Sequence, residues 1–334
     1  MTQTFKSFHE RLSILTDSER SFIYDLPNFT NLERKHYFDL EKIVNTTDEW
    51  IQSRTGIKKR HIAENELTSD LGYLAAKNAL EKSSLNSSDI NAIIVATTTP
   101  DRTFPSTAVA IQEKLGVKNA FAFDVQAVCS GFVYALDIAD NFIKSGKYKN
   151  ILVIGAETLS KILDWKDRNT CVLFGDGAGA VILSRSEDDS GILSSCLYSD
   201  GSLKGILETD GGTSLNQKAG IITMLGKEVF KHAVDKMSNS IIESLELANL
   251  TVDDVDYVIS HQANIRILSS VAKKLKLKDG QSVITVDKHA NTSAASIPLA
   301  LDDYLQNNKI KKGSIVVMNA LGAGLTWGSI VIRW

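Results

Sequence analysis

SSDINAIIVATTTP (residues 87–100) and VDDVDYVISHQANI (residues 252–265) share one pattern: a polar turn, an apolar run and a polar loop. Two further pairs follow in the same order. KYKNILVIGAE (147–157) resembles KIKKGSIVVMNALG (309–322). FGDGAGAVIL (174–183) resembles LGAGLTWGSIVI (321–332), and both segments of this pair read as a glycine-rich loop before a strand. The partners are 165, 162 and 147 residues apart. A solenoid would repeat at a far shorter period, so we predict a duplicated half, with two similar α/β units packed together.

The apolar runs along the rest of the chain also predict an α/β fold. They alternate with amphipathic helical stretches, and most are uninterrupted and rich in β-branched residues. Such strands are usually buried on both faces, in a parallel or mixed sheet under helices. A helix is predicted over Ser130–Ser145, with Gly146 as its stop. The predicted strands are Ile93–Thr98, Phe121–Val125, Ile151–Gly155, Ala180–Leu183, Tyr257–Ser260, Ser282–Val286, Ile315–Asn319 and Ser329–Ile332.

The charged stretch SRSEDDSG (184–191) is the predicted junction between the two units. It divides the chain into an atypical N-terminal segment (1–38), an N-terminal half (39–186) and a C-terminal half (187–334). Ligand sites in such architectures tend to lie where the carboxyl ends of strands meet. We therefore expect the functional site at the join of the halves.

Composition excludes several classes of protein. The chain has 334 residues, of which 43% are hydrophobic and 23% charged, so it is neither disordered nor fibrous. The N-terminal residues have no apolar core and no apolar run reaches about 18 residues, so we expect a cytoplasmic protein without a membrane span. A net charge of −3 argues against a general nucleic-acid binder. The three cysteines show no metal-ligand spacing, and no metal site is expected.

Cys129 is the candidate nucleophile. In FDVQAVCSGFVYAL (123–136) a predicted strand runs into a helix, with Cys129 at the turn. A thiol at a helix N-terminus feels the positive end of the helix dipole, which favours the thiolate. Taken alone, a buried structural cysteine is the commoner interpretation. Cys171 and Cys196 lack this context and are expected to be structural.

His261 and Asn291 are the candidate partners of Cys129. His261 directly follows the predicted strand YVIS in the second half, at the position that mirrors the TTTP loop of the first half. Asn291 lies in a polar loop that opens a helix and parallels the segment with Cys129, although a helix cap explains an asparagine there equally well. The repeat is expected to bring the cysteine of one half near the histidine and asparagine of the other.

Six motifs together resemble β-ketoacyl-acyl carrier protein synthase III, the initiating condensing enzyme of bacterial type II fatty acid synthesis. They are TTDEWIQSRTGI (46–57), CSGF (129–132), FGDGAGA (174–180), HQANIR (261–266), HANTSAASIP (289–298) and LGAGLTWG (321–328). The resemblance runs from about Asp39 to Trp334. It implies a thiolase-like fold, in which two duplicated α/β halves form a layered αβαβα core.

The resemblance also implies a Cys129–His261–Asn291 triad in a multifunctional acyltransferase. Cys129 would attack the thioester of acetyl-coenzyme A, which is a substrate, and no cofactor is expected. Malonyl-acyl carrier protein would then lose carbon dioxide, and His261 and Asn291 would stabilise the enolate by hydrogen bonds. The backbone N–H of Cys129, with one from the loop of Gly322 and Gly324, would hold the second oxyanion.

Further residues match ligand-binding positions of the family. Trp50, Arg54 and Arg168 would hold the nucleotide end of coenzyme A, because an indole and a guanidinium can sandwich adenine and arginines pair with phosphate. Phe104 would reach the acyl pocket of the partner subunit in a homodimer, where a bulky ring favours acetyl over long acyl primers. Plain core roles for Trp50 and Phe104 are the alternatives.

A basic helix is the candidate docking surface for the acidic acyl carrier protein. Over Asn264–Lys276 the apolar residues share one face and the basic residues the other. Lys227, Lys231 and Lys236 of a second helix would add to it. A solvated charged face is the alternative. The residues expected to bind the carrier protein are Gln262, Ala263, Asn264, Ile265, Arg266, Lys273 and Lys274.

Residues 1–38 depart from the family, whose members open with a glycine-containing first strand. This segment contains no glycine. Either the first strand has a different sequence, over Arg20–Leu26, or the segment is an aberrant extension. Ala323 is a second departure, in a loop often richer in glycine, and is expected to have little effect.

Two other functions are open at this point. One is a related thiolase-fold starter synthase that uses a different acyl-coenzyme A primer. The other is a catalytically silent acyl-binding partner, which the intact Cys129, His261 and Asn291 disfavour. The starter synthase and the initiating condensing enzyme differ only in the pocket that holds the acyl primer, and Phe104 is the one residue of the sequence that bears on this pocket.

Overall fold

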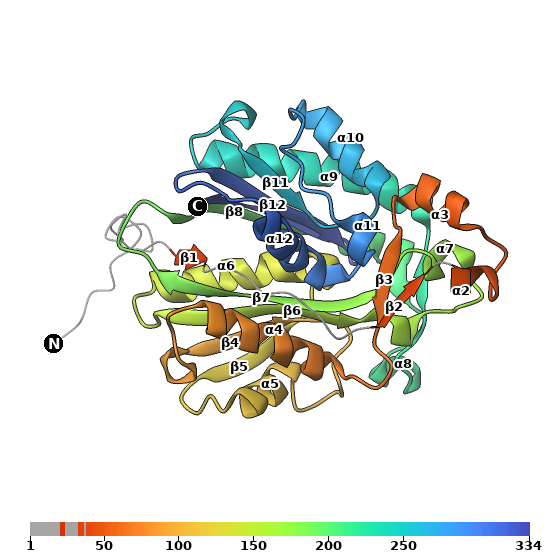
Figure 1. Cartoon of the computed structure of the whole chain (residues 1–334), viewed down its shortest axis with the longest axis horizontal. Helices are drawn as coiled ribbons and strands as arrows, with labels where there is room; N and C mark the ends of the chain where they lie inside the picture. Colours follow the sequence, from red (N-terminus) through yellow and green to blue (C-terminus); the bar gives the residue numbers. More distant parts are fainter. Residues whose placement is uncertain (1–20, 24–32, 37) are drawn as a thin grey trace.

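The computed structural model describes residues 21–23, 33–36 and 38–334. Two mixed β-sheets lie face to face, with helices between them and on both outer faces (Figure 1). Each sheet buries apolar side chains on both of its faces, so three layers of helices are needed to cover them. The predicted α/β fold with an αβαβα order of layers is confirmed.

The two sheets repeat one arrangement of strands. The first has the order β1-β7-β6-β4-β5 and the second, taken from the corresponding edge, β8-β13-β12-β11. In each, a parallel pair (β4 with β6, β11 with β12) is followed by two antiparallel neighbours. The first sheet has a second parallel pair, β4 with β5, at its other edge. Their strands are β1 (Ser21–Ile23), β4 (Ala92–Ala96), β5 (Phe121–Val125), β6 (Asn150–Thr158), β7 (Asp176–Arg185), β8 (Gly191–Ser199), β11 (Tyr257–Ser260), β12 (Ile315–Gly322) and β13 (Thr326–Arg333).

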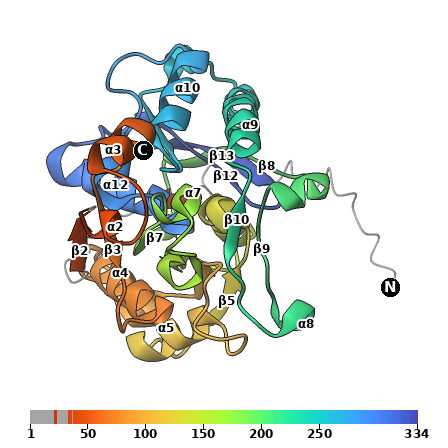
Figure 2. The same ribbon diagram turned by 90° about the vertical axis from the view of Figure 1, so that its right-hand side faces the viewer.

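Four short strands lie outside these sheets. β2 (Glu33–His36) pairs antiparallel with β3 (Lys59–Ile62), and β9 (Leu207–Thr209) pairs antiparallel with β10 (Ile222–Met224). With α7 (Arg168–Cys171), they lie on the side of the molecule that faces the viewer in Figure 2. This side also carries the larger cavity described below.

The helices divide into three layers. α4 (Thr68–Lys82) and α5 (Thr107–Leu115) cover the outer face of the first sheet, and α9 (Gly226–Leu247) and α10 (Ile265–Leu275) that of the second (Figure 1). α6 (Gly131–Lys144) and α12 (Ser296–Asn307) lie between the sheets. The shorter helices are α2 (Phe38–Glu41), α3 (Asp48–Thr55), α8 (Thr213–Asn216) and α11 (Val286–His289).

α6 confirms the helix predicted over Ser130–Ser145. Its apolar stripe, with Phe132, Leu136 and Ile143 completely buried, fills the space between the two sheets. The helix ends just before Gly146, which has a positive φ of 74° that favours glycine. Burial of the stripe on both sides anchors the N-terminal end of α6, and therefore Cys129, in the centre of the molecule.

The predicted strand Ser282–Val286 is wrong. Ser282 makes only an isolated parallel bridge to Val258, and α11 begins at Val286. The N–H groups of Thr285 and Val286 donate to the side chain of Gln262 and not to a neighbouring strand. The second sheet therefore has no full counterpart of β5.

The glycine-rich stretch FGDGAGA was expected to be a loop, and this prediction is wrong. Most of it is the first half of β7, which begins at Asp176. A Cβ atom on Gly179 would come within 2.8 Å of the Cβ of Pro298, and one on Gly155 within 2.3 Å of the carbonyl oxygen of Ala294. The glycines thus let the segment after Asn291 lie directly on the sheet.

The predicted first strand over Arg20–Leu26 is confirmed at Ser21–Ile23. This strand, β1, pairs antiparallel with β7 and occupies the place that β8 has in the second sheet. The remainder of the predicted range lies outside the described residues. The boundary placed after residue 186 falls between β7, which ends at Arg185, and β8, which begins at Gly191 in the other sheet.

Candidate active site

Cys129 occupies a tight turn between β5 and α6. The turn is a single 3-10 turn over Val128–Ser130, and Val128 has a φ of 47°, a strained value for a β-branched residue. The hydroxyl oxygens of Ser130 and Thr326 lie 2.6 Å apart, and Thr326 Oγ1 also donates to the carbonyl of Ala127 at 3.0 Å. The hairpin between β12 and β13 thereby holds the turn that presents the thiol.

His261 is the first residue after β11. Its backbone N–H donates to the carbonyl of Asn319 at 2.8 Å, and its Nδ1 lies 2.7 Å from Ser296 Oγ. Ser296 Oγ also accepts the backbone N–H of Gln262 at 3.3 Å. When the Ser296 hydroxyl donates to Nδ1, the ring proton lies on Nε2, which makes His261 a hydrogen-bond donor.

Asn291 occupies in the second half the position that Cys129 has in the first. The two numbers differ by 162, which is the offset between the paired segments of β6 and β12. Its backbone N–H donates to the carbonyl of Leu173 at 3.0 Å, and its Oδ1 accepts the N–H of Ser293 at 2.9 Å. Because the side-chain oxygen is engaged, the amide NH₂ is the group that Asn291 offers to a ligand.

Cys129, His261 and Asn291 line one cavity of about 850 Å³. All three are buried, with exposed fractions of 4%, 2% and 6%. Cys129 also lines a second cavity of about 370 Å³, whose other walls include apolar side chains such as Ile162 and Ile222. The thiol therefore lies where a larger cavity, with charged residues such as Arg54 and Arg266 on its walls, meets a smaller and more apolar one.

Burial determines the protonation of Cys129 and His261. Desolvation raises the pKa of the Cys129 thiol to about 12, and the nearby Glu157 carboxyl acts in the same direction. Desolvation lowers the pKa of His261 to about 4, so its ring is neutral at pH 7. The expectation of a thiolate favoured by the helix dipole is wrong for the free protein, because desolvation outweighs the stabilising contacts of the turn. The resting pair is a thiol and a neutral imidazole.

Sequence reasoning missed a buried carboxyl group next to Cys129. Glu157 of β6 is fully buried, and its Oε2 accepts hydrogen bonds from Thr99 Oγ1 at 2.7 Å and from the Thr98 N–H at 3.1 Å. Desolvation raises its pKa to about 7. Ser293 lowers the pKa of both Glu157 and Cys129, so its hydroxyl lies near both. The position of Glu157 in an apolar strand was the one available signal.

The two glycines proposed for the oxyanion lie beside the nucleophile turn. A Cβ atom on Gly322 would come within 2.7 Å of the backbone nitrogen of Cys129, so only glycine leaves this N–H accessible. Gly322 is the last residue of β12 and not part of a loop, because it pairs with Thr326 across the hairpin. Gly324, with a φ of 132°, lines the smaller cavity.

Of the three residues matched to coenzyme A, one is on the wall of the larger cavity. Arg54 lines the cavity itself. The Arg168 guanidinium lies 4.6 Å from the centre of the Trp50 ring, and its Nη1 donates to the carbonyl of Asn45 at 3.0 Å. Trp50 and Arg168 therefore stack on each other in the described structure, and a nucleotide base would have to enter between them or stack on an outer face.

Phe104 lies outside both cavities. Its side chain is 82% exposed, which excludes the alternative of a core phenylalanine. Within this chain the structure does not bring it near Cys129.

The residues expected to bind the carrier protein separate into two groups. Arg266, Lys273 and Lys274 are exposed on α10, and Lys274 is paired with Asp235 of α9 at 2.6 Å. Ala263 and Asn264 line the larger cavity, where Asn264 caps α10, and Ile265 packs against Gly56. Gln262 is only 1% exposed, so its side chain has no surface to offer a partner. The exposed part of this set is therefore Arg266 and the two lysines.

Two sequence profiles match the segments that form this site. That of 3-oxoacyl-[acyl-carrier-protein] synthase III matches residues 123–201, and that of its C-terminal part matches residues 245–334. The first contains Cys129 and the second contains His261 and Asn291. This chain belongs to the 3-oxoacyl-[acyl-carrier-protein] synthase III family. The family indicated by the motifs is thus confirmed, and with it an acyltransferase of the condensing type.

Relatives of the synthase III family cover nearly the whole chain. β-Ketoacyl-[acyl-carrier-protein] synthase III of Ehrlichia canis is 58% identical over 297 residues, which are 88% of this chain and 93% of that protein. The crystal structure of 3-oxoacyl-[acyl-carrier-protein] synthase III from Aquifex aeolicus has a TM-score of 0.90 at 48% identity and covers 94% of this chain and 100% of that one. The priming β-ketosynthase of the R1128 polyketide pathway has a TM-score of 0.89 at 31% identity and covers 94% and 96%. The thiolase-like fold is confirmed by these structures.

The described residues offer neither a membrane-spanning helix nor a cluster of metal ligands. No helix in them is long and apolar enough to cross a bilayer. Within the same ranges, His, Cys, Asp and Glu side chains form no group of three that could hold a metal ion.

Proposed function

We propose that this chain joins acetyl-coenzyme A and malonyl-acyl carrier protein to give acetoacetyl-acyl carrier protein, coenzyme A and carbon dioxide. The observation that carries the proposal is the position of Cys129, at the meeting of two cavities, with His261 and Asn291 lining the larger one. The larger cavity would admit the thioester arm of either substrate. The smaller would hold the acyl group.

The first step is the transfer of an acetyl group to Cys129. The Cys129 sulfur attacks the thioester carbonyl, the bond to the coenzyme A sulfur breaks, and the proton of the Cys129 thiol ends on the departing thiol. The backbone N–H of Cys129, which Gly322 leaves accessible, would donate to the carbonyl oxygen as it gains charge. The exchange of one thiol for another is balanced in protons and needs no oxidant.

The second step is a decarboxylative condensation. The bond between the malonyl methylene and its carboxylate breaks, carbon dioxide leaves, and the electron pair forms an enolate on the thioester. His261 and Asn291 would donate hydrogen bonds to the enolate oxygen, and a neutral His261 does so without having to ionise. The enolate carbon then attacks acetyl-Cys129, and the Cys129 sulfur leaves and takes up a proton.

Substrate binding is assigned to the rim of the larger cavity. Arg54 would pair with phosphate of coenzyme A, and Trp50 and Arg168 would hold the adenine end. The exposed Arg266 and Lys273 on α10 would meet acidic residues of the carrier protein, because opposite charges steer such encounters.

We further propose a homodimer in the cytoplasm. Phe104 is 82% exposed, which is unusual for a phenylalanine, and a partner subunit would cover it. In the partner's acyl pocket its ring would leave room for a short primer. The second candidate function, a starter synthase for a longer primer, differs only in this pocket.

Mass spectrometry of protein and product tests the proposal. Incubation with acetyl-coenzyme A should add one acetyl group to Cys129, and addition of malonyl-acyl carrier protein should remove it and yield acetoacetyl-acyl carrier protein. Loading by longer acyl-coenzyme A in preference to acetyl-coenzyme A would favour the starter synthase. Absence of any acyl adduct on Cys129 would contradict both functions.

A further inference from the structure

The carboxamide of Gln262 uses its full hydrogen-bonding capacity inside the protein. Its Nε2 donates to the carbonyls of Ser260 at 2.8 Å and Val283 at 3.1 Å. Its Oε1 accepts the N–H groups of Thr285 at 2.8 Å and Val286 at 3.1 Å. A carboxamide has two donor hydrogens and two acceptor lone pairs, and all four are engaged. Since Gln262 is 1% exposed, these bonds are shielded from water.

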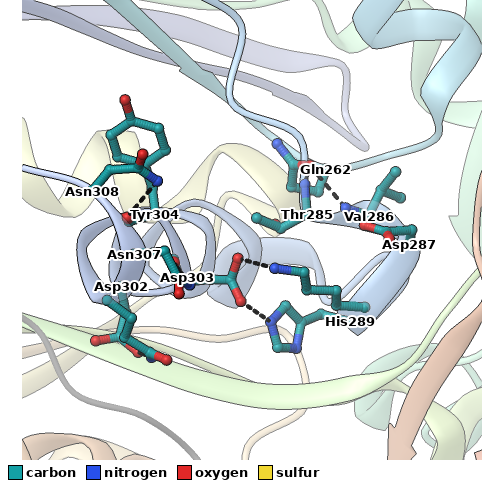
Figure 3. Close-up of polar contacts among 12 residues, drawn as sticks. Gln262, Thr285, Val286, Asp287, His289, Asp302, Asp303, Tyr304, Asn307 and Asn308 are labelled. Carbon is teal, nitrogen blue, oxygen red and sulfur yellow. Dashed lines mark hydrogen bonds and ion pairs between the residues drawn. The ribbon is translucent and has the colours of Figure 1, made fainter. Parts of the chain in front are cut away.

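These four bonds join the two segments that carry His261 and Asn291. Ser260 ends β11 immediately before His261, whereas Thr285 and Val286 begin α11, from which the chain reaches Asn291 in five residues. Figure 3 shows the carboxamide of Gln262 reaching toward the N–H groups at the start of α11. Gln262 thus occupies the place where a further strand would otherwise have paired.

The other end of α11 is held independently. Lys288 Nζ lies 2.6 Å from Asp303 Oδ2, and the His289 ring lies 3.9 Å from Asp303 Oδ1, so α12 holds this end (Figure 3). Ser296, also on α12, contacts both His261 Nδ1 and the backbone N–H of Gln262. The Gln262 side chain is therefore the link at the start of α11 between the histidine turn and the asparagine segment.

We propose that Gln262 is a positioning residue for decarboxylation, which sets His261 and Asn291 at the separation that one enolate oxygen requires. The inference rests on the proposed function, in which both side chains donate to that oxygen. When a catalytic hydrogen-bond donor is displaced by about 1 Å, the rate of the reaction that it assists can fall about a hundredfold. Acetylation of Cys129 does not use the enolate, so Gln262 should affect the two half-reactions differently.

Gln262→Glu tests the proposal. The substitution keeps the shape of the side chain but places a carboxyl oxygen against the carbonyls of Ser260 and Val283, where donors are needed. The rate of malonyl-acyl carrier protein decarboxylation (kcat) should fall by about 10- to 100-fold. The rate of Cys129 acetylation should stay within about threefold, and KM for the carrier protein should not change.

Gln281→Glu is the matched control. Gln281 also bonds two main-chain groups, the carbonyl of Val255 and the N–H of Lys278, but it does not link the His261 and Asn291 segments. It should lower the thermal unfolding midpoint without lowering decarboxylation. If Gln262→Glu does not fold, Gln262→Asn provides the same test, because the shorter carboxamide cannot bond the end of β11 and the start of α11 at once.

Three outcomes would overturn the inference. The first is an unchanged kcat for decarboxylation in Gln262→Glu. The second is a higher KM for the carrier protein with kcat intact, which would place Gln262 at the docking surface. The third is an equal loss of the acetylation and decarboxylation rates. In each case the wild-type protein serves as the reference. Failure of the wild type to acetylate or decarboxylate would contradict the proposed function and not the role of Gln262.

Discussion

Replacement of the buried carboxyl group by an amide in Glu157→Gln should change how stability depends on pH. Glu157 is fully buried, and its described hydrogen bonds come from neutral groups, the side chain of Thr99 and the N–H of Thr98 among them. Desolvation raises its pKa from an ordinary value of 4.5 to about 7. The folded protein therefore holds a proton on Glu157 that the unfolded chain releases at a lower pH.

The sign and size of the effect follow from these two pKa values. Between about pH 4.5 and pH 7 the folded state binds more protons than the unfolded state, so stability falls as the pH rises. Each pH unit in this window corresponds to about 1.4 kcal/mol, which gives a loss of about 3 kcal/mol across it. Glutamine does not titrate. The free energy of unfolding of the wild type, relative to that of Glu157→Gln, should therefore decrease by about 3 kcal/mol from about pH 4.5 to about pH 7.

Urea unfolding of both proteins from pH 4.5 to pH 8, followed by tryptophan fluorescence, measures this difference. Groups that titrate alike in both proteins cancel. Glu113→Gln, which replaces an exposed glutamate on α5, is the matched control for the loss of one carboxyl group. Alkylation of Cys129 by iodoacetamide gives a second measurement. Above pH 7 it should be faster in Glu157→Gln, because the Glu157 carboxylate raises the thiol pKa.

Parallel stability curves for wild type and Glu157→Gln would refute this reasoning. They would mean that the Glu157 carboxyl titrates at the same pH in the folded and unfolded states. A carboxylate that stays ionised in the folded protein would require a cation or ordered water beside it.

Three further predictions concern the proposed reaction. Cys129→Ala should abolish the acetyl adduct and condensation while malonyl decarboxylation persists, and mass spectrometry that finds the adduct on Cys171 instead would contradict the assignment. Phe104→Thr should let longer acyl primers load while acetyl loading changes little, as measured by loading rates across a primer series, and a wild type that already prefers long primers would argue against it. Arg266→Glu with Lys273→Glu should raise KM for malonyl-acyl carrier protein at low salt, although each exposed charge pair is worth only about 0.2–1 kcal/mol. Because Arg266 also lines the larger cavity, the single variant Lys273→Glu tests docking of the carrier protein without a change at the coenzyme A site. An unchanged KM in the double and the single variant would place the docking surface elsewhere.

Patterns along the chain were enough to predict the fold and three central residues. The repeat of a polar turn, strand and loop predicted that β4 and β11 occupy equivalent places in the two halves, and the four strands of the second sheet do correspond to four of the five in the first. The position of Cys129 at a strand-to-helix turn and of His261 at a strand end followed from the same apolar periods. Such patterns reflect the local requirement that each strand bury its side chains, so they are visible in consecutive residues.

The protonation state of the site depended on tertiary structure. A cysteine before a helix predicts a thiolate, yet the Cys129 pKa is raised because side chains from both halves exclude water from it. The same exclusion raises the pKa of Glu157, a residue that no motif singled out. Desolvation is produced by residues far apart in sequence, so a local pattern does not record it.

Sequence by itself determined the duplicated α/β fold, the family and the residues that face the larger cavity, because apolar period and motif order are properties of the chain. Tertiary structure alone decided which residues of the motifs meet solvent. Gln262 and Arg266 stand four residues apart in one motif, but one is buried with four internal hydrogen bonds and the other is exposed on α10. The reason is physical: the absence of a full counterpart of β5 leaves backbone N–H groups that a buried carboxamide must satisfy.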